Sequence, residues 1–195
     1  MSDVTAVPIA PVKRSWLVWL VGAIAVAALG GIALAWTGTA KTVAESGSNA
    51  QFLAWHKGRP GVVTTTSGVQ YLVIKAAKKD EVATPTDADV ALINYKGSLR
   101  TGKVFDEAQR APFPITGVVP GFSEALKLMP RGSTYRFWIP SELGYGAQAQ
   151  GETIPANSLL VFDVDMIDFK NQAELQAQMQ AMQAQGQLPG VGAPR

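Results

Sequence analysis

The chain has 195 residues, which is enough for one domain with appendages. It carries 17 Lys and Arg against 15 Asp and Glu, so its net charge is only +2. This balance argues against a nucleic-acid partner, because proteins that bind nucleic acids carry a clustered basic excess. The sequence contains no Cys and a single His, His56. Disulfides, cysteine nucleophiles, Cys-ligated zinc and a His-rich metal site are therefore excluded.

An uncharged apolar segment lies near the N-terminus. Residues 15–40 include no charged residue, and 19 of these 26 positions are apolar. A helix over residues 16–36 would be about 31 Å long, which matches the hydrocarbon core of a bilayer. Tryptophans, which favour the membrane interface, lie at its two ends: Trp16, Trp19 and Trp36. We predict a transmembrane helix or signal anchor over residues 16–36.

The residues around this segment predict its orientation. Lys13 and Arg14 precede it, so the positive-inside rule leaves residues 1–15 in the cytoplasm and exports the rest of the chain. A cleavable signal peptide is the alternative, because small residues at 33–35 and 37–40 would suit a peptidase. The apolar run is longer than a usual signal-peptide core, which favours the uncleaved anchor. Both interpretations export the C-terminal domain.

The rest of the chain predicts an α+β fold. A linker with a short helix occupies residues 37–61. Branched and alternating patterns predict strands at residues 62–66, 69–74, 90–99, 134–139 and 159–168, with a further extended piece from Val104. Two prolines make residues 111–114 an edge or a loop. Apolar residues spaced i, i+3, i+4, i+7 predict one short helix closed by Pro130, namely Phe122, Ala125, Leu126 and Met129.

A Gln-rich extension follows in residues 170–195. Seven Gln lie between residues 171 and 187, and Leu175, Met179 and Met182 are spaced i, i+4, i+7. This spacing predicts a marginal amphipathic helix, either as a solvated extension or as a surface for self-association or client contact. Residues 188–195 are rich in Pro and Gly, and we expect a disordered tail.

Six short motifs follow one another in a specific order. They are N-Y-K-G at 94–97, T-G-K-V-F-D at 101–106, V-V-P-G-F at 118–122, L-G-Y-G at 143–146, I-P-A-N-S at 154–158 and L-V-F-D-V at 160–164. In this order they resemble the FKBP-type peptidyl-prolyl cis-trans isomerases over residues 62–169. Residues 52–71 look like the lead-in of bacterial exported members, including proteins similar to the macrophage infectivity potentiator group.

The resemblance implies a bent antiparallel sheet wrapped around the short helix at residues 121–129, with an apolar cleft between them. It implies a catalytic set of Tyr95, Phe105, Asp106, Tyr145 and Ile154. It also implies a substrate-binding set of Phe113, Val118, Val119, Phe122 and Phe162. Phe122 would form the floor under the proline ring, at a position where many members have Trp. Neither a metal nor another cofactor is implied.

The implied roles are non-covalent. The hydroxyl of Tyr145 and the backbone N–H of Ile154 would bond the substrate carbonyls that flank the proline. Asp106 would face the rotating carbonyl and orient Tyr95. We therefore expect a peptidyl-prolyl isomerase that assists the folding of exported proteins. The second hypothesis is a catalytically weak chaperone or adaptor for Pro-containing segments. The third is a structural role as part of an envelope assembly.

The expected partners and compartment follow from the same resemblance. We expect proline-containing polypeptide clients, macrolides such as FK506 or rapamycin as possible ligands, the lipid bilayer through residues 16–36, and no nucleic acid. The anchor together with the family implies a single-pass protein of the inner membrane with a periplasmic catalytic domain.

Overall fold

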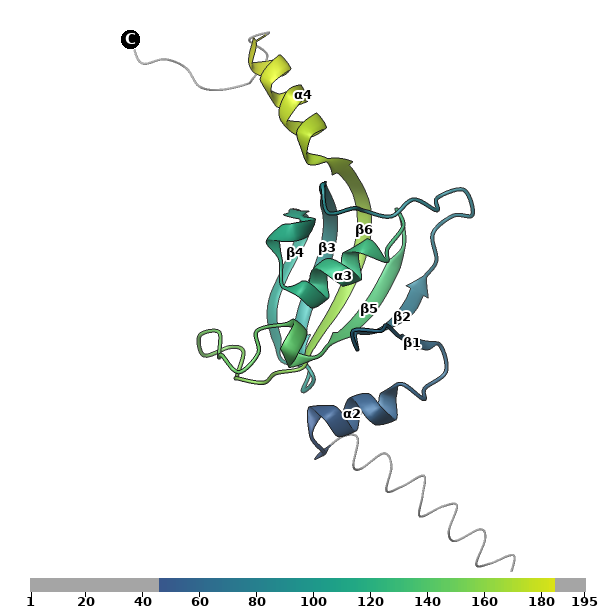
Figure 1. Ribbon diagram of the computed structural model, residues 1–195, viewed down its shortest axis with the longest axis vertical. Helices are drawn as coiled ribbons and strands as arrows, with labels where there is room; N and C mark the ends of the chain where they lie inside the picture. The colour runs from purple at the N-terminus through teal and green to yellow at the C-terminus, as the bar shows by residue number, and fades with distance from the viewer. Residues whose placement is uncertain (1–45, 185–195) are drawn as a thin grey trace, which may run out of the picture. The chain divides into compact units, whose positions relative to one another are not determined.

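The computed structural model describes residues 46–184, which form one antiparallel sheet and three helices (Figure 1). The sheet order is β1-β2-β5-β6-β3-β4. The strands are β1 Val62–Thr64, β2 Gln70–Lys75, β3 Asp89–Leu99, β4 Val104–Pro114, β5 Thr134–Ile139 and β6 Leu160–Asn171. The helices are α2 Asn49–His56, α3 Pro120–Lys127 and α4 Gln172–Ala184, with 3-10 turns η1 Ile115–Gly117 and η2 Ser141–Leu143.

The predicted membrane segment at residues 16–36 lies outside the described residues, as do the N-terminal residues 1–15 and the tail from residue 185. Within residues 46–184, no helix is both long and apolar enough to cross a bilayer.

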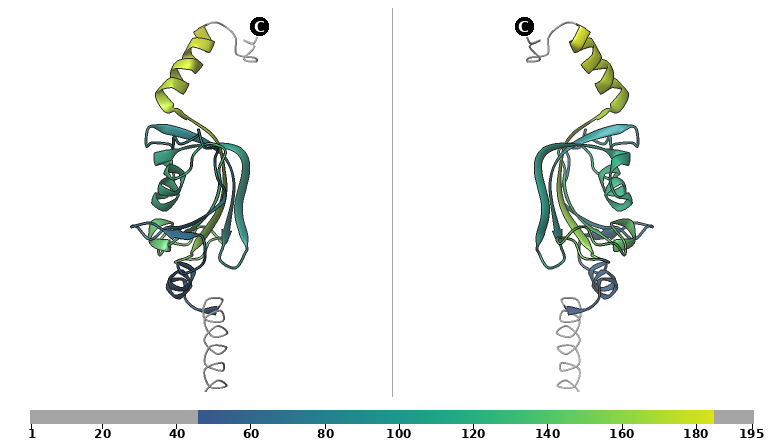
Figure 2. Two further views of the ribbon diagram at one scale, coloured as in Figure 1. Left: turned by 90° about the vertical axis from the view of Figure 1, so that its right-hand side faces the viewer. Right: turned by 90° about the vertical axis from the view of Figure 1, so that its left-hand side faces the viewer.

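The sheet buries one face of each central strand. Along β6, Leu160, Phe162, Val164 and Met166 are all at most 6% exposed, while Asp165 between them is exposed. This alternation is the one predicted from the sequence, because successive side chains of a strand point to opposite faces. The register of β3 shifts against both of its neighbours, between Leu92 and Ile93 against β6 and between Ile93 and Tyr95 against β4. Such irregularities bend a strand, and the sheet curves around α3 (Figure 2).

Helix α3 covers the concave face of the sheet (Figure 2). It begins at Pro120, whose fixed φ suits a first helical position. The helix ends at Lys127, two residues before the predicted end. Leu128 and Met129 instead form a tighter turn, donating to the carbonyls of Ala125 and Leu126. Pro130 follows directly, and the residue before a proline avoids the helical conformation, which explains the early end.

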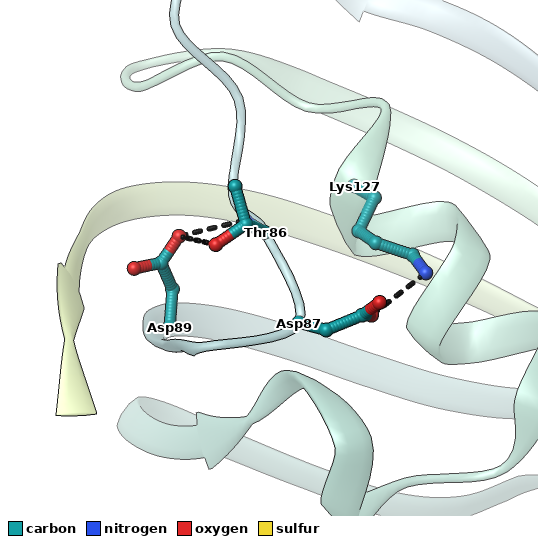
Figure 3. Close-up of polar contacts among 4 residues, drawn as sticks. All are labelled: Thr86, Asp87, Asp89 and Lys127. Carbon is teal, nitrogen blue, oxygen red and sulfur yellow. Dashed lines mark hydrogen bonds and ion pairs between the residues drawn. The ribbon is translucent and has the colours of Figure 1, made fainter.

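The segment leading into β3 is tied to α3 (Figure 3). The backbone N–H and the hydroxyl of Thr86 both donate to the Asp89 carboxylate, at 2.7 and 2.8 Å. Lys127 pairs with Asp87 at 2.8 Å. Both charged side chains of that pair are more than a third exposed, so the ion pair adds little stability and mainly sets the path of the loop.

The two prolines at residues 112 and 114 lie at the end of β4, an edge strand, as their missing N–H groups require.

Helix α4 follows β6 at the C-terminal end of the described chain. It is capped by Asn171, whose side-chain oxygen accepts from the N–H of Ala173 at 3.0 Å. Met179 and Met182 on α4 are 59% and 52% exposed, so the apolar stripe predicted for this helix is largely open to solvent.

Helix α2 is fastened to the sheet through the single histidine. The Nδ1 atom of His56 lies 2.7 Å from the Oε1 atom of Gln70, and the Nε2 atom of Gln70 donates to the carbonyl of Leu53 at 2.8 Å. The His56 ring lies 4.0 Å from the ring of Trp138 on β5. His56 and Gln70 are 8% and 3% exposed, so these bonds satisfy polar groups that would otherwise be buried without partners.

We predict that Gly121→Ala destabilises the domain by about 1–3 kcal/mol. A Cβ at this position would lie 2.4 Å from the Cγ2 atom of Ile139, which is fully buried and cannot move aside. This clash outweighs the gain of about 0.5–1 kcal/mol that Ala normally brings to a helix. Denaturant unfolding measures the effect. Gly58→Ala is the control, because its nearest neighbour would be 3.5 Å away, and an equal loss in both variants would contradict the prediction.

We predict that acid weakens the fold through His56. Burial is the main cause that lowers the pKa of His56; the positive charge of Arg59 lowers it further, and the bond to Gln70 opposes both. The neutral ring is therefore favoured in the folded state. Its stabilisation is fully present above the unfolded pKa of about 6.5 and is lost as the pH falls from there through the lower folded pKa.

Urea unfolding on both sides of that window measures this loss in the wild type and in His56→Gln. The variant lacks the titrating ring, so its free energy of unfolding should fall less on acidification. An identical fall in the two proteins would assign the pH dependence to other groups.

Candidate functional site

Five aromatic rings from β3, β4, α3 and β6 meet over the concave side of the sheet. The ring of Phe122 lies 4.5 Å from that of Phe162, and its other neighbours are Phe113 at 6.2 Å and Tyr95 at 6.4 Å. Tyr95 and Phe113 meet edge to face at 5.3 Å, and so do Phe105 and Phe162 at 5.6 Å. The family resemblance had placed all five among the ten implied site residues, Tyr95 and Phe105 in the catalytic set and the other three in the substrate-binding set. The structure brings them together as an aromatic cluster.

The cluster has a buried base and a partly open rim. Phe122 and Phe162 are 4% and 6% exposed, whereas Tyr95, Phe105 and Phe113 are half-buried. Val118 and Val119, between η1 and α3, are also half-buried and pack against the same core. The arrangement presents an apolar surface in which Phe122 is the least exposed ring; its role as the floor under a proline ring stays a prediction.

A glycine determines where Phe105 lies. A Cβ on Gly97 would lie 2.6 Å from the Cε2 atom of Phe105 and 2.9 Å from the Cε1 atom of Phe162. Only a residue without a side chain allows these two rings to pack across β3 at this point. Gly97 lies within the N-Y-K-G motif, but the motif by itself predicts no role for it. Because the contact joins three strands, no local pattern could have revealed it.

Tyr95 and Asp106 form the polar part of the cluster. The hydroxyl of Tyr95 donates to the Oδ2 atom of Asp106 at 2.6 Å. The pairing of β3 with β4 places Gly97 opposite Asp106 and Tyr95 opposite Ala108, so the two side chains meet diagonally across the strands. Burial raises the pKa of Tyr95 to about 12, and the bond to Asp106 and its negative charge act in the same direction.

The loop at residues 144–158 carries the last two predicted site residues. Tyr145 is 37% exposed, and its charge is the smallest of the causes that raise the pKa of Tyr95. The side chain of Ile154 is 6% exposed and belongs to the core. The N–H of Ile154, which the sequence interpretation assigned to a substrate carbonyl, donates to the carbonyl of Gln150 at 3.3 Å. A substrate carbonyl would have to share or replace this long bond.

A model of the family described as FKBP-type peptidyl-prolyl cis-trans isomerase matches residues 81–167, which include the whole aromatic cluster. The chain is 38% identical over 126 residues to the outer membrane protein MIP of Legionella longbeachae, covering 63% of this chain and 53% of the relative. It is 40% identical over 122 residues to an FKBP-type 22 kDa peptidyl-prolyl cis-trans isomerase of Escherichia coli, covering 60% of this chain and 58% of the relative.

The crystal structure of FkpA from Escherichia coli superimposes with a TM-score of 0.58 and 30% identity, covering 82% of this chain and 74% of that one. The chain spans about half the length of the curated relatives it matches. The bent six-stranded sheet, its single covering helix and the matched residues agree, and the chain belongs to the FKBP-type peptidyl-prolyl cis-trans isomerase family.

Proposed function

We propose that this protein catalyses the cis-trans isomerisation of X-Pro peptide bonds in polypeptide clients. The observation that carries this proposal is the aromatic cluster based on Phe122, with the Tyr95–Asp106 hydrogen bond at its rim. Membership of the isomerase family supports the same activity. The cluster offers an apolar surface for a proline ring, next to polar groups that can meet the flanking backbone.

The chemistry requires no covalent step. An X-Pro bond has partial double-bond character, its rotational barrier is about 18–20 kcal/mol, and uncatalysed exchange takes roughly 10–100 s. Rotation to the twisted state breaks amide conjugation and reduces the charge separation across the carbonyl and the nitrogen. An apolar surface that excludes water therefore favours the twisted state over the planar one. Each 1.36 kcal/mol of this preference accelerates exchange about tenfold.

The side chains receive roles on this basis. Phe122 supports the proline ring, and Phe105, Phe113 and Phe162 exclude water together with Val118 and Val119. Tyr145 and the N–H of Ile154 hold the backbone carbonyls that flank the proline. Asp106 holds the phenol of Tyr95 in one orientation, which keeps the shape of the cluster. Macrolides such as FK506 or rapamycin would occupy the same surface.

The clients and the compartment belong to the same proposal. One relative is named an outer membrane protein, and the uncharged segment at residues 16–36 follows two basic residues. These features support a single-pass anchor in the inner membrane, with residues 1–15 in the cytoplasm and the isomerase domain at about residues 62–169 in the periplasm. The clients would then be exported proteins that fold there.

A second candidate function is a catalytically weak chaperone or adaptor that binds Pro-containing segments. It is favoured by Phe122, a smaller ring at the position where many family members have Trp. The retained Tyr95–Asp106 hydrogen bond favours the isomerase.

The isomerase proposal predicts that Phe105→Ala lowers kcat/KM for cis-to-trans exchange of an X-Pro peptide by at least tenfold. Without the Phe105 ring, water reaches the apolar surface of the cluster. The assay uses the full chain, with the unfolding free energy measured beside it. No acceleration by folded wild-type protein would instead favour the chaperone or adaptor.

We predict that Asp106→Asn lowers kcat/KM, because Tyr95 loses its charged acceptor. Asp165→Asn is the matched control, since Asp165 is an exposed carboxylate of β6 that accepts from Thr134 and lies outside the cluster. Equal activities of Asp106→Asn and Asp165→Asn would remove Asp106 from the proposed site.

The same substitution should shift the titration of Tyr95. The phenol has a pKa of about 12, partly through the bond to Asp106 and its charge, so Asp106→Asn should lower this pKa towards the ordinary value of about 10. Ultraviolet titration of the phenolate measures it, with Tyr95→Phe identifying the signal. An unchanged titration in Asp106→Asn would show that burial alone raises the pKa.

A further inference from the structure

Helix α2 contacts both segments that bring polar site residues to the aromatic cluster. The side-chain amide of Asn49, its first residue, donates to the carbonyl of Asn157 in the loop at residues 144–158, with an Nδ2–O distance of 2.8 Å. The guanidinium of Arg100, in the turn that leads to β4, lies 5.5 Å from the centre of the Phe52 ring. The loop carries Tyr145 and Ile154, and β4 carries Phe105 and Asp106.

The Asn49 bond reaches the loop at Asn157, where the backbone turns and bonds back to the start of the loop. Asn157 has φ +57°, a left-handed conformation that few residues other than glycine tolerate. Its N–H donates to the carbonyl of Gly146 at 2.8 Å, and the N–H of Gly146 donates to the carbonyl of Ser141 at 2.8 Å. The residue next to Tyr145 is therefore tied to Asn157, and Asn157 is tied to α2.

The loop needs this support because its central part is exposed. Gln148 donates to the carbonyl of Tyr145 and Ile154 to that of Gln150, both at 3.3 Å, while Gln150 donates back to the carbonyl of Ile154 at 2.8 Å. Residues 147–152 are all exposed, so little apolar burial holds this part of the loop in one conformation.

We propose that α2 is a brace for the loop at residues 144–158, and that Asn49 is a positioning residue for Tyr145 and Ile154. The proposal rests on the isomerase function proposed above. A braced loop meets the substrate backbone already ordered, whereas a loop without the brace must lose conformational freedom when the substrate binds.

Helix α2 is itself held firmly enough for this task. His56 and Gln70 join it to β2 through two short hydrogen bonds, and the His56 ring packs on Trp138 of β5. Phe52 stacks on His56, with ring centres 5.1 Å apart. The same helix therefore contacts the sheet at its last residue and the loop at its first.

The test substitutes Asn49→Asp in the full chain. Aspartate has the same shape as asparagine but no donor at this position, and its negative charge faces a carbonyl oxygen. An acidic residue in the first turn stabilises a helix, so loss of activity cannot come from unwinding of α2. Asn49→Gln keeps an amide donor and serves as the rescue variant.

Asn171→Asp is the matched control. Asn171 also bonds a backbone group at the start of a helix, but it accepts rather than donates, and aspartate accepts equally well. It lies at the far end of β6 from the loop, about 36 Å of extended strand away.

We expect Asn49→Asp to lower kcat/KM about two- to tenfold, mainly through a higher KM, as for the loss of one hydrogen bond. Hydrogen–deuterium exchange of peptides covering residues 144–158 should become faster. Asn49→Gln should recover most of both values, and Asn171→Asp should change neither.

The proposal would be overturned by unchanged exchange of the loop in Asn49→Asp, by an equal effect of Asn171→Asp, or by faster exchange with an unaltered KM. If the wild-type chain does not accelerate isomerisation, the proposed function fails. The exchange data then decide the brace alone: faster exchange of the loop supports it, and unchanged exchange rejects it.

Discussion

The contact between Phe122 and Phe162 organises the domain. It joins α3 to the concave face of β6 at a ring distance of 4.5 Å, and both residues are almost fully buried. A six-stranded sheet with one helix on it has only this layer in which to bury apolar side chains. The rings that complete the cluster come from β3 and β4, so the packing that stabilises the fold also builds the site.

Two glycines make that packing possible. Gly121 lets the start of α3 approach Ile139 on β5, and Gly97 lets Phe105 cross β3 to reach Phe162. In both places a single methyl group would occupy the space of a buried side chain. The position of the site therefore depends on the absence of a Cβ atom at residues 97 and 121 as much as on the rings themselves.

The polar groups of the site are held less tightly than the rings. Tyr95 has a short bond to Asp106, and its raised pKa keeps the phenol protonated well above neutral pH. Tyr145 and Ile154, by contrast, lie on a loop whose residues 147–152 are all exposed, and α2 adds a contact to this loop from outside. The proposed reaction needs a dry surface more than a reactive group. The buried rings supply that surface, and the contact from α2 orders the loop that meets the substrate backbone.

Much of this molecule could be predicted from its sequence, because the signals are local. Alternation along residues 159–168 predicted which face of β6 is buried, and the spacing of Phe122, Ala125 and Leu126 predicted α3. The two prolines of β4 predicted an edge or a loop, and the structure has an edge strand there. The ordered motifs, read as a family resemblance, grouped the five rings that the structure brings together. Physical periodicity alone would have assigned each of those rings only to a core.

Tertiary structure decided what depends on residues far apart in the chain. Asn49 and Asn157 are 108 residues apart, and His56 meets Gln70 and Trp138 on two different strands. The need for glycine at position 97 comes from two rings on other strands. Sequence by itself determined most of the elements and their buried faces, since these follow from spacing along one segment, and the order of six motifs carried the resemblance to the family. Folding alone decided the partners of each polar group, because hydrogen bonds and close contacts depend on distances in space that no local pattern contains.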